Sequence, residues 1–206
     1  MIKKKIGIID LGINNLHSLK EACNSLGYKT SLINLGQKNY NFEILILPGI
    51  GSFKKAMQIV KKHNIKEKIL KHINNKEKIL VGICLGMQMF FSSSNEFGNT
   101  KGLNLIEGRV KKFDKKKLIT PHTSWNSIKI VKKDYILKNK FKKNMFYFTH
   151  SFYCKPKNTN YIIGKTNYSN FEFCSIIKKN NIFGMQFHPE KSGLSGLEIL
   201  RNLKIN

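Results

Sequence analysis

The stretch ILVGICLGMQMFF, residues 79–91, places Cys84 between two glycines, where an apolar run gives way to a helical pattern. The run 79–83 is typical of a strand buried on both faces of a parallel sheet, and 85–91 is typical of a helix. The motif G-x-C-x-G therefore has the layout of a nucleophile elbow, with cysteine in place of serine. In such a turn the strand ends, the backbone bends sharply, and the reactive atom is held above the edge of the sheet.

The elbow would prepare the Cys84 thiol for nucleophilic attack. The amino end of a following helix favours negative charge, which here means thiolate over thiol. The backbone N–H of Leu85 would point to where an oxyanion forms. Side chains at positions 82 and 86 would collide with the adjoining strand and helix, which explains the two glycines. The alternative is that Cys84 is a small core residue whose glycine neighbours are incidental.

A histidine later in the chain has the position of a general base. A thiolate nucleophile needs a base that also acts as an acid. In GMQFHPEKS, residues 184–192, His188 follows an apolar strand that a proline ends, and Glu190 is close enough to orient the imidazole. The alternative is a turn histidine without a catalytic role. Of the other histidines, His122 and His150 are the ones that do not fall on an expected helix face.

The segment LPGIGSF, residues 47–53, follows another apolar strand with a glycine-rich loop. Ligands of open parallel sheets bind beyond the carboxyl ends of the strands, where this loop is expected. Its Gly-Ile-Gly sequence lets the backbone approach a ligand closely and lets a peptide flip. The alternative is an ordinary strand-to-helix turn. Three features at three strand ends, each suited to one role in acyl transfer, favour one shared site.

The first half of the chain alternates between strand and helix patterns. Strands are expected at 5–9, 30–33, 44–47 and 79–83, and helices at 16–26, 53–60 and 65–73. The alternation predicts an α/β fold with an open, mostly parallel sheet flanked by helices. The second half is strand-rich, and antiparallel pairs are expected there among 105–113, 127–131, 145–150, 161–166, 172–177 and 182–187, before a closing helix at 194–203. No repeat or linker divides the chain, so 1–206 is expected to form a single domain.

Composition limits the classes of function. The formal net charge is +25, which invites a nucleic-acid hypothesis, but Arg109 and Arg201 are the only arginines and the lysines are spread along the chain. We interpret them mainly as solvated surface and expect no nucleic-acid partner. The four cysteines form no C-x-x-C pair, which argues against a zinc site and a disulfide framework. No apolar run is long enough to span a membrane and no secretory signal is evident, so a cytoplasmic protein is expected.

Four segments together resemble a known family. LPGIGSF, GICLGMQ, MFYFTHSF and FGMQFHPEKSG are similar to the class I glutamine amidotransferases, and within them to the glutaminase subunits of imidazole glycerol phosphate synthase in histidine biosynthesis. The resemblance runs from about Ile6 to Leu203. The cysteine elbow and the His-Pro-Glu run are shared by many class I members. The P-G-[IV]-G loop and the Tyr-Phe-x-His run indicate the subfamily.

The resemblance implies a mechanism and a set of site residues. Cys84 would attack the side-chain amide of L-glutamine, and His188, oriented by Glu190, would protonate the departing ammonia and then activate water. The implied oxyanion hole consists of the amides of Leu85 and Ile50, the latter after the loop rearranges. The implied glutamine-binding residues are Gly51, Gln88, Glu96 and Ser151, and the implied interface residues are Trp125, Asn126 and Tyr147. The resemblance implies neither an organic cofactor nor a metal.

The resemblance also implies a partner. In the family, ammonia passes into a TIM-barrel cyclase subunit of a heterodimer. There it reacts with a ribotide to give imidazole glycerol phosphate and an aminoimidazole carboxamide ribotide. One departure bears on the partner, because this chain has PHTSWN at 121–126 where the family usually has P-H-M-G-W-N. Two alternatives therefore stay open: an ammonia supply to a cyclase-like partner in surface-sugar (acetamidino) modification, and a basic nucleic-acid-binding protein.

Overall fold

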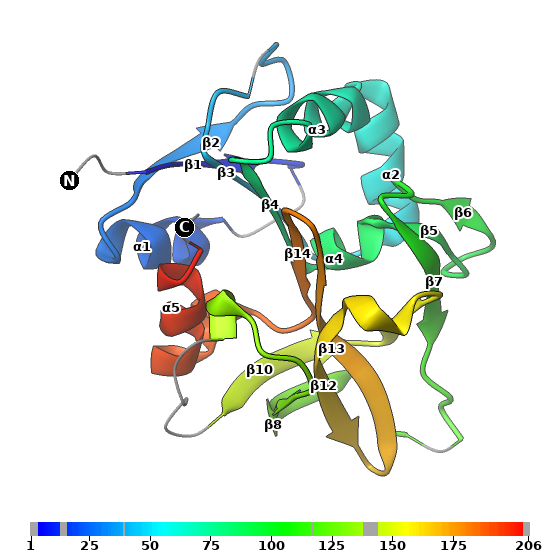
Figure 1. Ribbon diagram of the computed structural model, residues 1–206. Coiled ribbons are helices and arrows are strands. Elements are labelled where there is room, and N and C mark those ends of the chain that lie inside the picture. The colour runs from blue at the N-terminus through cyan, green and yellow to red at the C-terminus, as the bar shows by residue number, and fades with distance from the viewer. Residues whose placement is uncertain (1–3, 13–15, 39, 117, 138–143, 204–206) are drawn as a thin grey trace.

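A parallel sheet forms the centre of the protein. The computed structural model describes residues 4–12, 16–38, 40–116, 118–137 and 144–203 (Figure 1). The parallel strands, in spatial order, are β2 (Lys29–Ile33), β1 (Lys5–Ile9), β3 (Ile44–Gly49), β4 (Ile79–Cys84) and β14 (Ile182–Met185). Every residue of β3 and β4 is buried, as expected for central strands with both faces covered.

Helices cover both faces of this sheet. The helices are α1 (His17–Ser25), α2 (Phe53–Lys62), α3 (Ile65–Ile73), α4 (Leu85–Met89) and α5 (Gly193–Arg201). Side chains alternate along β3, so Ile44 and Ile46 pack in one apolar cluster with α1 and α5, whereas Leu45 and Leu47 pack in another with α2, α3 and α4. Figure 1 shows α1 and α5 together, apart from α2 and α3.

The second half of the chain extends the same sheet with mostly antiparallel strands. Within the described residues, twelve strands join into one sheet. The added strands are β5 (Phe91–Ser94), β6 (Thr100–Lys101), β7 (Ile106–Lys112), β9 (Lys129–Ile130), β11 (Phe152–Pro156), β12 (Ile162–Tyr168) and β13 (Phe171–Lys179). A separate antiparallel pair consists of β8 (His122–Ser127) and β10 (Met145–His150). Short 3₁₀ turns lie at η1 (Tyr135–Leu137), η2 (Thr159–Tyr161) and η3 (Pro189–Lys191).

The predicted α/β class is confirmed, and two of the predicted elements are wrong. The expected helix over 85–91 ends at Met89, and Phe91 begins β5, which pairs with β7. A short apolar run fits a buried strand as well as a helix, and here pairing with another strand decides. The single strand expected over 127–131 does not form, because β8 ends at Ser127 and β9 has only two residues. The polar sequence of β8 gives no apolar signal, and its register with β10 forms it.

None of the described helices is long and apolar enough to cross a bilayer.

Candidate active site

Cys84 lies at a strained turn between β4 and α4. Its backbone has φ 52° and ψ −108°, a combination that side chains with a Cβ rarely adopt. Such strain persists only where the surrounding packing imposes it, and here the fully buried β4 leads directly into the five-residue α4. Cys84 is 6% exposed and its sulfur lies 3.9 Å from the carbonyl oxygen of Thr149. The turn has the geometry that the elbow motif predicts.

The two glycines beside Cys84 are required by close packing. A Cβ at Gly86 would lie 1.7 Å from the backbone oxygen of Leu47 in β3. A Cβ at Gly82 would lie 2.5 Å from the ring of Phe90 and 2.7 Å from the backbone nitrogen of Met87. These distances are far inside van der Waals contact, so α4 can approach the sheet only over glycine. Cys84 is thereby fixed at the strand end.

His188 follows β14, the strand next to β4, so the imidazole and the thiol meet at one edge of the sheet. Its Nδ1 lies 2.8 Å from Oε1 of Glu190. Its backbone is held at both ends, because its N–H donates to Tyr147 and its carbonyl accepts from the Ser192 hydroxyl. Among the described residues, no group meets Nε2 of His188 with ordinary hydrogen-bond geometry, although the Cys84 sulfur is near enough to affect its charge. The ring is thus oriented by Glu190 and leaves Nε2 for the thiol and substrate.

The electrostatics favour a protonated His188. Burial lowers the pKa of this imidazole, but the negative charge of Cys84 and the carboxylate of Glu190 outweigh burial and raise the pKa from 6.5 to about 10. At neutral pH the Nε2 proton is therefore present beside the sulfur. An imidazolium in this place can give its proton to a leaving amine.

A cavity of about 420 Å³ opens beside the thiol. Its lining contains Cys84, Leu85 and all the residues for which the resemblance implies glutamine binding or a second oxyanion amide, namely Ile50, Gly51, Gln88, Glu96 and Ser151. The resemblance implies no glutamine-binding role for the other lining residues, which are Pro121, Thr149, His150, Phe152 and Lys191. The structure thus brings one strand end, the glycine loop and the end of β10 around one space.

Two of the expected glutamine-binding side chains also have partners within the protein. Glu96 accepts the backbone N–H of Phe53 through Oε2, at the amino end of α2, where a negative charge is favoured. Gln88 donates through Nε2 to the carbonyl of Phe152 and to Oε1 of Gln186. The cavity therefore has polar groups that are already oriented.

The three expected interface residues do not share one face. Trp125 is 50% exposed and packs edge-on against Tyr147, its neighbour across β8 and β10, with ring centroids 6.1 Å apart. Lys191, which lines the cavity, lies over the same Tyr147 ring. Asn126 lies on the other side of β8 and donates to the carbonyl of Asn167. Trp125 and Tyr147 are therefore linked to the cavity through Lys191, and Asn126 is turned away from them.

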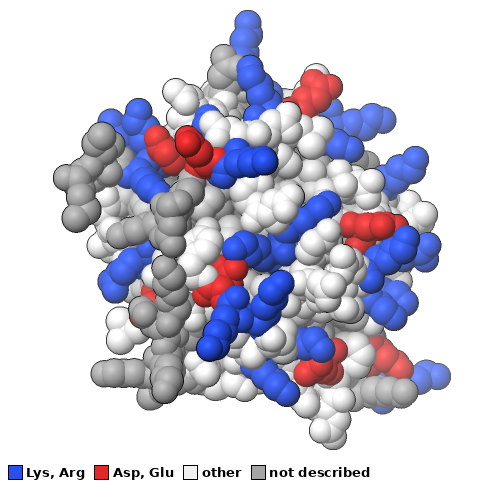
Figure 2. Space-filling model, in the orientation of Figure 1, with Lys and Arg blue, Asp and Glu red and all other residues white. Residues whose placement is uncertain are grey.

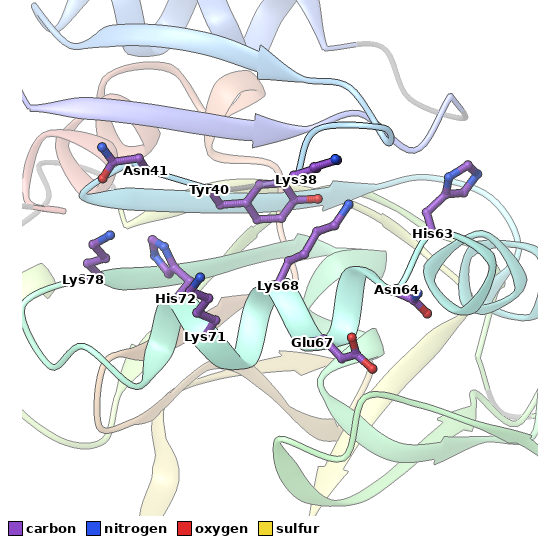
Figure 3. A pocket seen from close by; sticks show the side chains of 10 residues that line it. All are labelled: Lys38, Tyr40, Asn41, His63, Asn64, Glu67, Lys68, Lys71, His72 and Lys78. Atoms are coloured by element: carbon purple, nitrogen blue, oxygen red, sulfur yellow. The ribbon is translucent and has the colours of Figure 1, made fainter.

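A larger cavity lies elsewhere and has different chemistry. It measures about 780 Å³ and lies between α3 and the segment before β3 (Figure 3). Lys68 reaches from α3 toward the Tyr40 ring, with Nζ 5.5 Å from its centroid. The lining residues are Lys38, Tyr40, Asn41, His63, Asn64, Glu67, Lys68, Lys71, His72 and Lys78. This cavity is the larger of the two, but the thiol, imidazole and carboxylate lie at the smaller one, which is therefore the candidate active site.

The basic residues form no single stripe on the face that Figure 2 shows. Lysine and arginine are scattered over it, with acidic side chains among them. This distribution is typical of a solvated surface rather than of a groove that follows a phosphate backbone.

The fold and the site together define a class of protein. An imidazole that lies between a thiol and a carboxylate at the carboxyl ends of parallel strands is typical of cysteine-dependent acyl transfer. The chain belongs to the class-I glutamine amidotransferase family, whose model matches residues 7–206. Within that family its similar relatives carry the name imidazole glycerol phosphate synthase subunit HisH. The resemblance that the four segments indicated is thus confirmed.

The relatives match over nearly their whole length. HisH of Methanocaldococcus jannaschii is 43% identical, with 96% of this chain and 97% of the relative covered. HisH of Caldanaerobacter subterraneus is 42% identical, with 96% of each covered. Among solved structures, PurLQS of Thermotoga maritima matches with a TM-score of 0.78 at 19% identity and 98% coverage of both chains. A putative GMP synthase subunit of Thermoplasma acidophilum matches with a TM-score of 0.72 at 17% identity, covering 98% and 93%. At these sequence identities the solved structures support the fold assignment alone.

Proposed function

We propose that this chain is the glutaminase subunit of an imidazole glycerol phosphate synthase, which hydrolyses L-glutamine to glutamate and supplies the ammonia to a cyclase subunit. One observation carries the chemistry: Cys84 and His188 leave adjacent strands at the same sheet edge, and Glu190 is 2.8 Å from the far nitrogen of the imidazole. The HisH relatives support the assignment to this pathway, because each is 36–43% identical over at least 195 residues.

The first half of the reaction forms a thioester. The Cys84 sulfur adds to the side-chain carbonyl carbon of glutamine, and the carbonyl oxygen takes up the negative charge. His188 gives its Nε2 proton to the amide nitrogen as the C–N bond breaks, so ammonia leaves and a glutamyl thioester remains. Glu190 keeps Nδ1 of the ring occupied, which holds Nε2 toward the reacting atoms.

The second half hydrolyses the thioester. The neutral imidazole of His188 takes a proton from water, and the hydroxide adds to the thioester carbonyl. Glutamate leaves as the C–S bond breaks, and the proton on His188 restores the starting pair of imidazolium and thiolate.

Two backbone amides are proposed to bind the oxyanion. Leu85 follows the nucleophile directly, and Ile50 belongs to the glycine loop that lines the same cavity. Gly51 has φ 90°, which allows the loop a path that other residues rarely take. We propose that the Ile50 peptide turns toward the cavity when the partner binds. For glutamine itself, we propose contacts with Gly51, Gln88, Glu96 and Ser151, whose side chains and backbone surround the cavity.

The partner is proposed to be a TIM-barrel cyclase of histidine biosynthesis. The HisH names of the relatives favour this pathway over surface-sugar modification. The exposed Trp125 and its neighbour Tyr147, whose ring lies under the cavity-lining Lys191, support docking on this side. We also propose that the protein acts in the cytoplasm.

The nucleophile is tested by Cys84→Ala. With the histidine-pathway cyclase and its substrate present, we expect the variant to release no measurable glutamate, since no other described thiol lines the cavity. Glutamate release is followed by a coupled dehydrogenase assay. Cys174→Ala, which removes a buried thiol from β13, is the matched control and should keep most of the activity. Glutamate release by Cys84→Ala at the parent rate would show that the assigned nucleophile is wrong.

A further inference from the structure

Gln186 lies between the nucleophile and a residue of the glutamine cavity. It is completely buried, one residue after β14. Its Nε2 lies 3.7 Å from the Cys84 sulfur, and its Oε1 lies 3.2 Å from Nε2 of Gln88. A carboxamide presents a donor at one end and an acceptor at the other, so its orientation decides what the sulfur meets.

The orientation of Gln186 follows from a backbone carbonyl. The carbonyl of Phe152 can only accept, and the side-chain amide of Gln88 lies 3.1 Å from it. Gln88 must therefore turn its NH₂ group toward Phe152, and the second hydrogen of that group points to Gln186. The side-chain oxygen of Gln186 must accept this hydrogen, which leaves the NH₂ group of Gln186 facing the sulfur.

A buried histidine pair fixes the same carbonyl from the other side. Nδ1 of His150 donates to the Phe152 oxygen at 2.8 Å, so its Nε2 is the acceptor and receives the Nδ1 hydrogen of His122 at 3.2 Å. Nε2 of His122 then accepts from the Asn126 amide at 3.5 Å. Every donor in the series points toward the Phe152 carbonyl, which is held by two donors.

The histidine pair keeps these tautomers because it stays neutral. Burial lowers the pKa of His122 to about 4. Burial, together with the charges of His122 and His188, lowers the pKa of His150 to about 3, although the hydrogen bond to Phe152 partly opposes this shift. Neither ring takes a proton near neutral pH, so the series of donors persists under working conditions.

We propose that Gln186 is a further residue of the reaction, whose carboxamide N–H donates to the Cys84 sulfur and stabilises the thiolate, with Gln88 and the Phe152 carbonyl holding the amide in that orientation. The inference rests on the proposed function, because it assumes that Cys84 is the nucleophile. As a thiol, Cys84 can donate its hydrogen to the carbonyl of Thr149 at 3.9 Å. As a thiolate it can only accept, and Gln186 then supplies a hydrogen bond to the ionised form.

A test of Gln186 must leave the other titratable or charged side chains near the sulfur unchanged. They are the titratable or charged side chains of the cavity and the adjoining strands: Glu96, His150, Cys154, His188, Glu190 and Lys191. A change confined to Gln186 leaves each of these residues in place, so the resulting difference belongs to the carboxamide.

The test measures how fast iodoacetamide alkylates Cys84 as pH is raised, by mass spectrometry of the peptide that contains Cys84. The rate reports the thiolate, whether or not glutamine is hydrolysed. In Gln186→Met, which keeps the length and loses the donor, we expect the midpoint of the pH profile to rise by about one pH unit. In Gln186→Glu the midpoint should rise further, because a carboxylate would face the sulfur. Gln58→Glu, on the exposed side of α2, is the matched control and should keep the parent midpoint.

The outcomes separate this inference from the proposed function. Parent midpoints in both Gln186 variants, with circular dichroism showing folded protein, would overturn the role of Gln186 even if Cys84→Ala is inactive. Activity in Cys84→Ala would overturn the proposed function whatever the Gln186 variants do. Should a variant fail to fold, an NMR titration of the parent protein tests the inference instead. The chemical shifts of the Gln186 side-chain amide protons should change with pH at the midpoint of alkylation. Chemical shifts that stay constant over this pH range would overturn the inference.

Discussion

At the scale of single residues, the site depends on where hydrogen-bond donors point. His188 has one ring nitrogen on Glu190 and the other toward the thiol, so its two faces have separate tasks. Gln186 has its two ends on Gln88 and Cys84 in the same way. Each side chain can act on the sulfur because its far end is already occupied. Preorganisation of this kind fixes the reacting groups before substrate arrives.

Glu190→Gln should reduce stability in a pH-dependent way. In the parent, His188 keeps its proton up to about pH 10, whereas in the unfolded chain it loses the proton near 6.5. The folded state therefore gains stability that is fully present below pH 6.5 and disappears as pH rises through about 10. The variant lacks one of the charges that raise this pKa. We expect the difference in urea midpoint between parent and variant to narrow across this window, and Glu77→Gln, an exposed loop change, should show no such trend. A difference that is constant from pH 6.5 to 10 would contradict the prediction.

The sequence motifs name three residues of the candidate site but do not name Gln186, which lies among them. Cys84, His188 and Glu190 belong to motifs, and the structure brings them together. Gln186 was missed, although it belongs to the same GMQFHPE run as His188. Its partner Gln88 lies 98 residues away in sequence. Contacts over such separations come from tertiary packing, which a local pattern does not carry.

At the scale of elements, the contact between β3 and α4 holds the elbow. The helix can follow the strained Cys84 only because Gly86 lets it rest on the backbone of Leu47. The prediction of a glycine requirement came from the motif, whereas the end of α4 at Met89 did not follow from the pattern. The strand pairing of β5 with β7 sets that boundary, and this pairing has no local signature.

Gly86→Ala should destabilise the fold strongly. The added methyl group would lie 1.7 Å from the backbone oxygen of Leu47 and 2.8 Å from its carbonyl carbon. Because both atoms belong to the backbone of β3, they cannot move aside without displacing the strand. We expect the free energy of unfolding to fall by at least about 2 kcal/mol, measured by urea denaturation. Gly36→Ala is the matched control, because nothing lies within 4 Å of its added methyl group. It should change stability by less than about 1 kcal/mol. Equal stability of the two variants would show that α4 does not need its close approach.

At the scale of the whole molecule, we propose that residues 1–206 form a single domain. The support is the strand order, in which β14 from the end of the chain lies between β4 of the first half and β13 of the second. The chain has one tryptophan, Trp125, in the strand pair β8 and β10, while most of the described helices belong to the first half. Fluorescence and far-ultraviolet circular dichroism should therefore report different halves. We expect both signals to change at the same urea concentration, whereas separate midpoints would indicate two folding units.

The proposed partner would act on the glycine loop that lines the cavity. Ile50 is 44% exposed in the loop that would complete the oxyanion hole, and Trp125 is 50% exposed on β8. We expect the isolated chain to hydrolyse glutamine slowly, and the cyclase with its bound ligand to raise kcat/KM at least about tenfold. Trp125→Ala should weaken binding of the cyclase about thirtyfold or more, as loss of a central aromatic contact does. Leu32→Ala, an exposed apolar change on the edge strand β2, should bind as the parent does. Titration calorimetry measures both affinities. Fast hydrolysis by the isolated chain would contradict the gated loop, and unchanged binding of Trp125→Ala would move the docking surface away from β8 and β10.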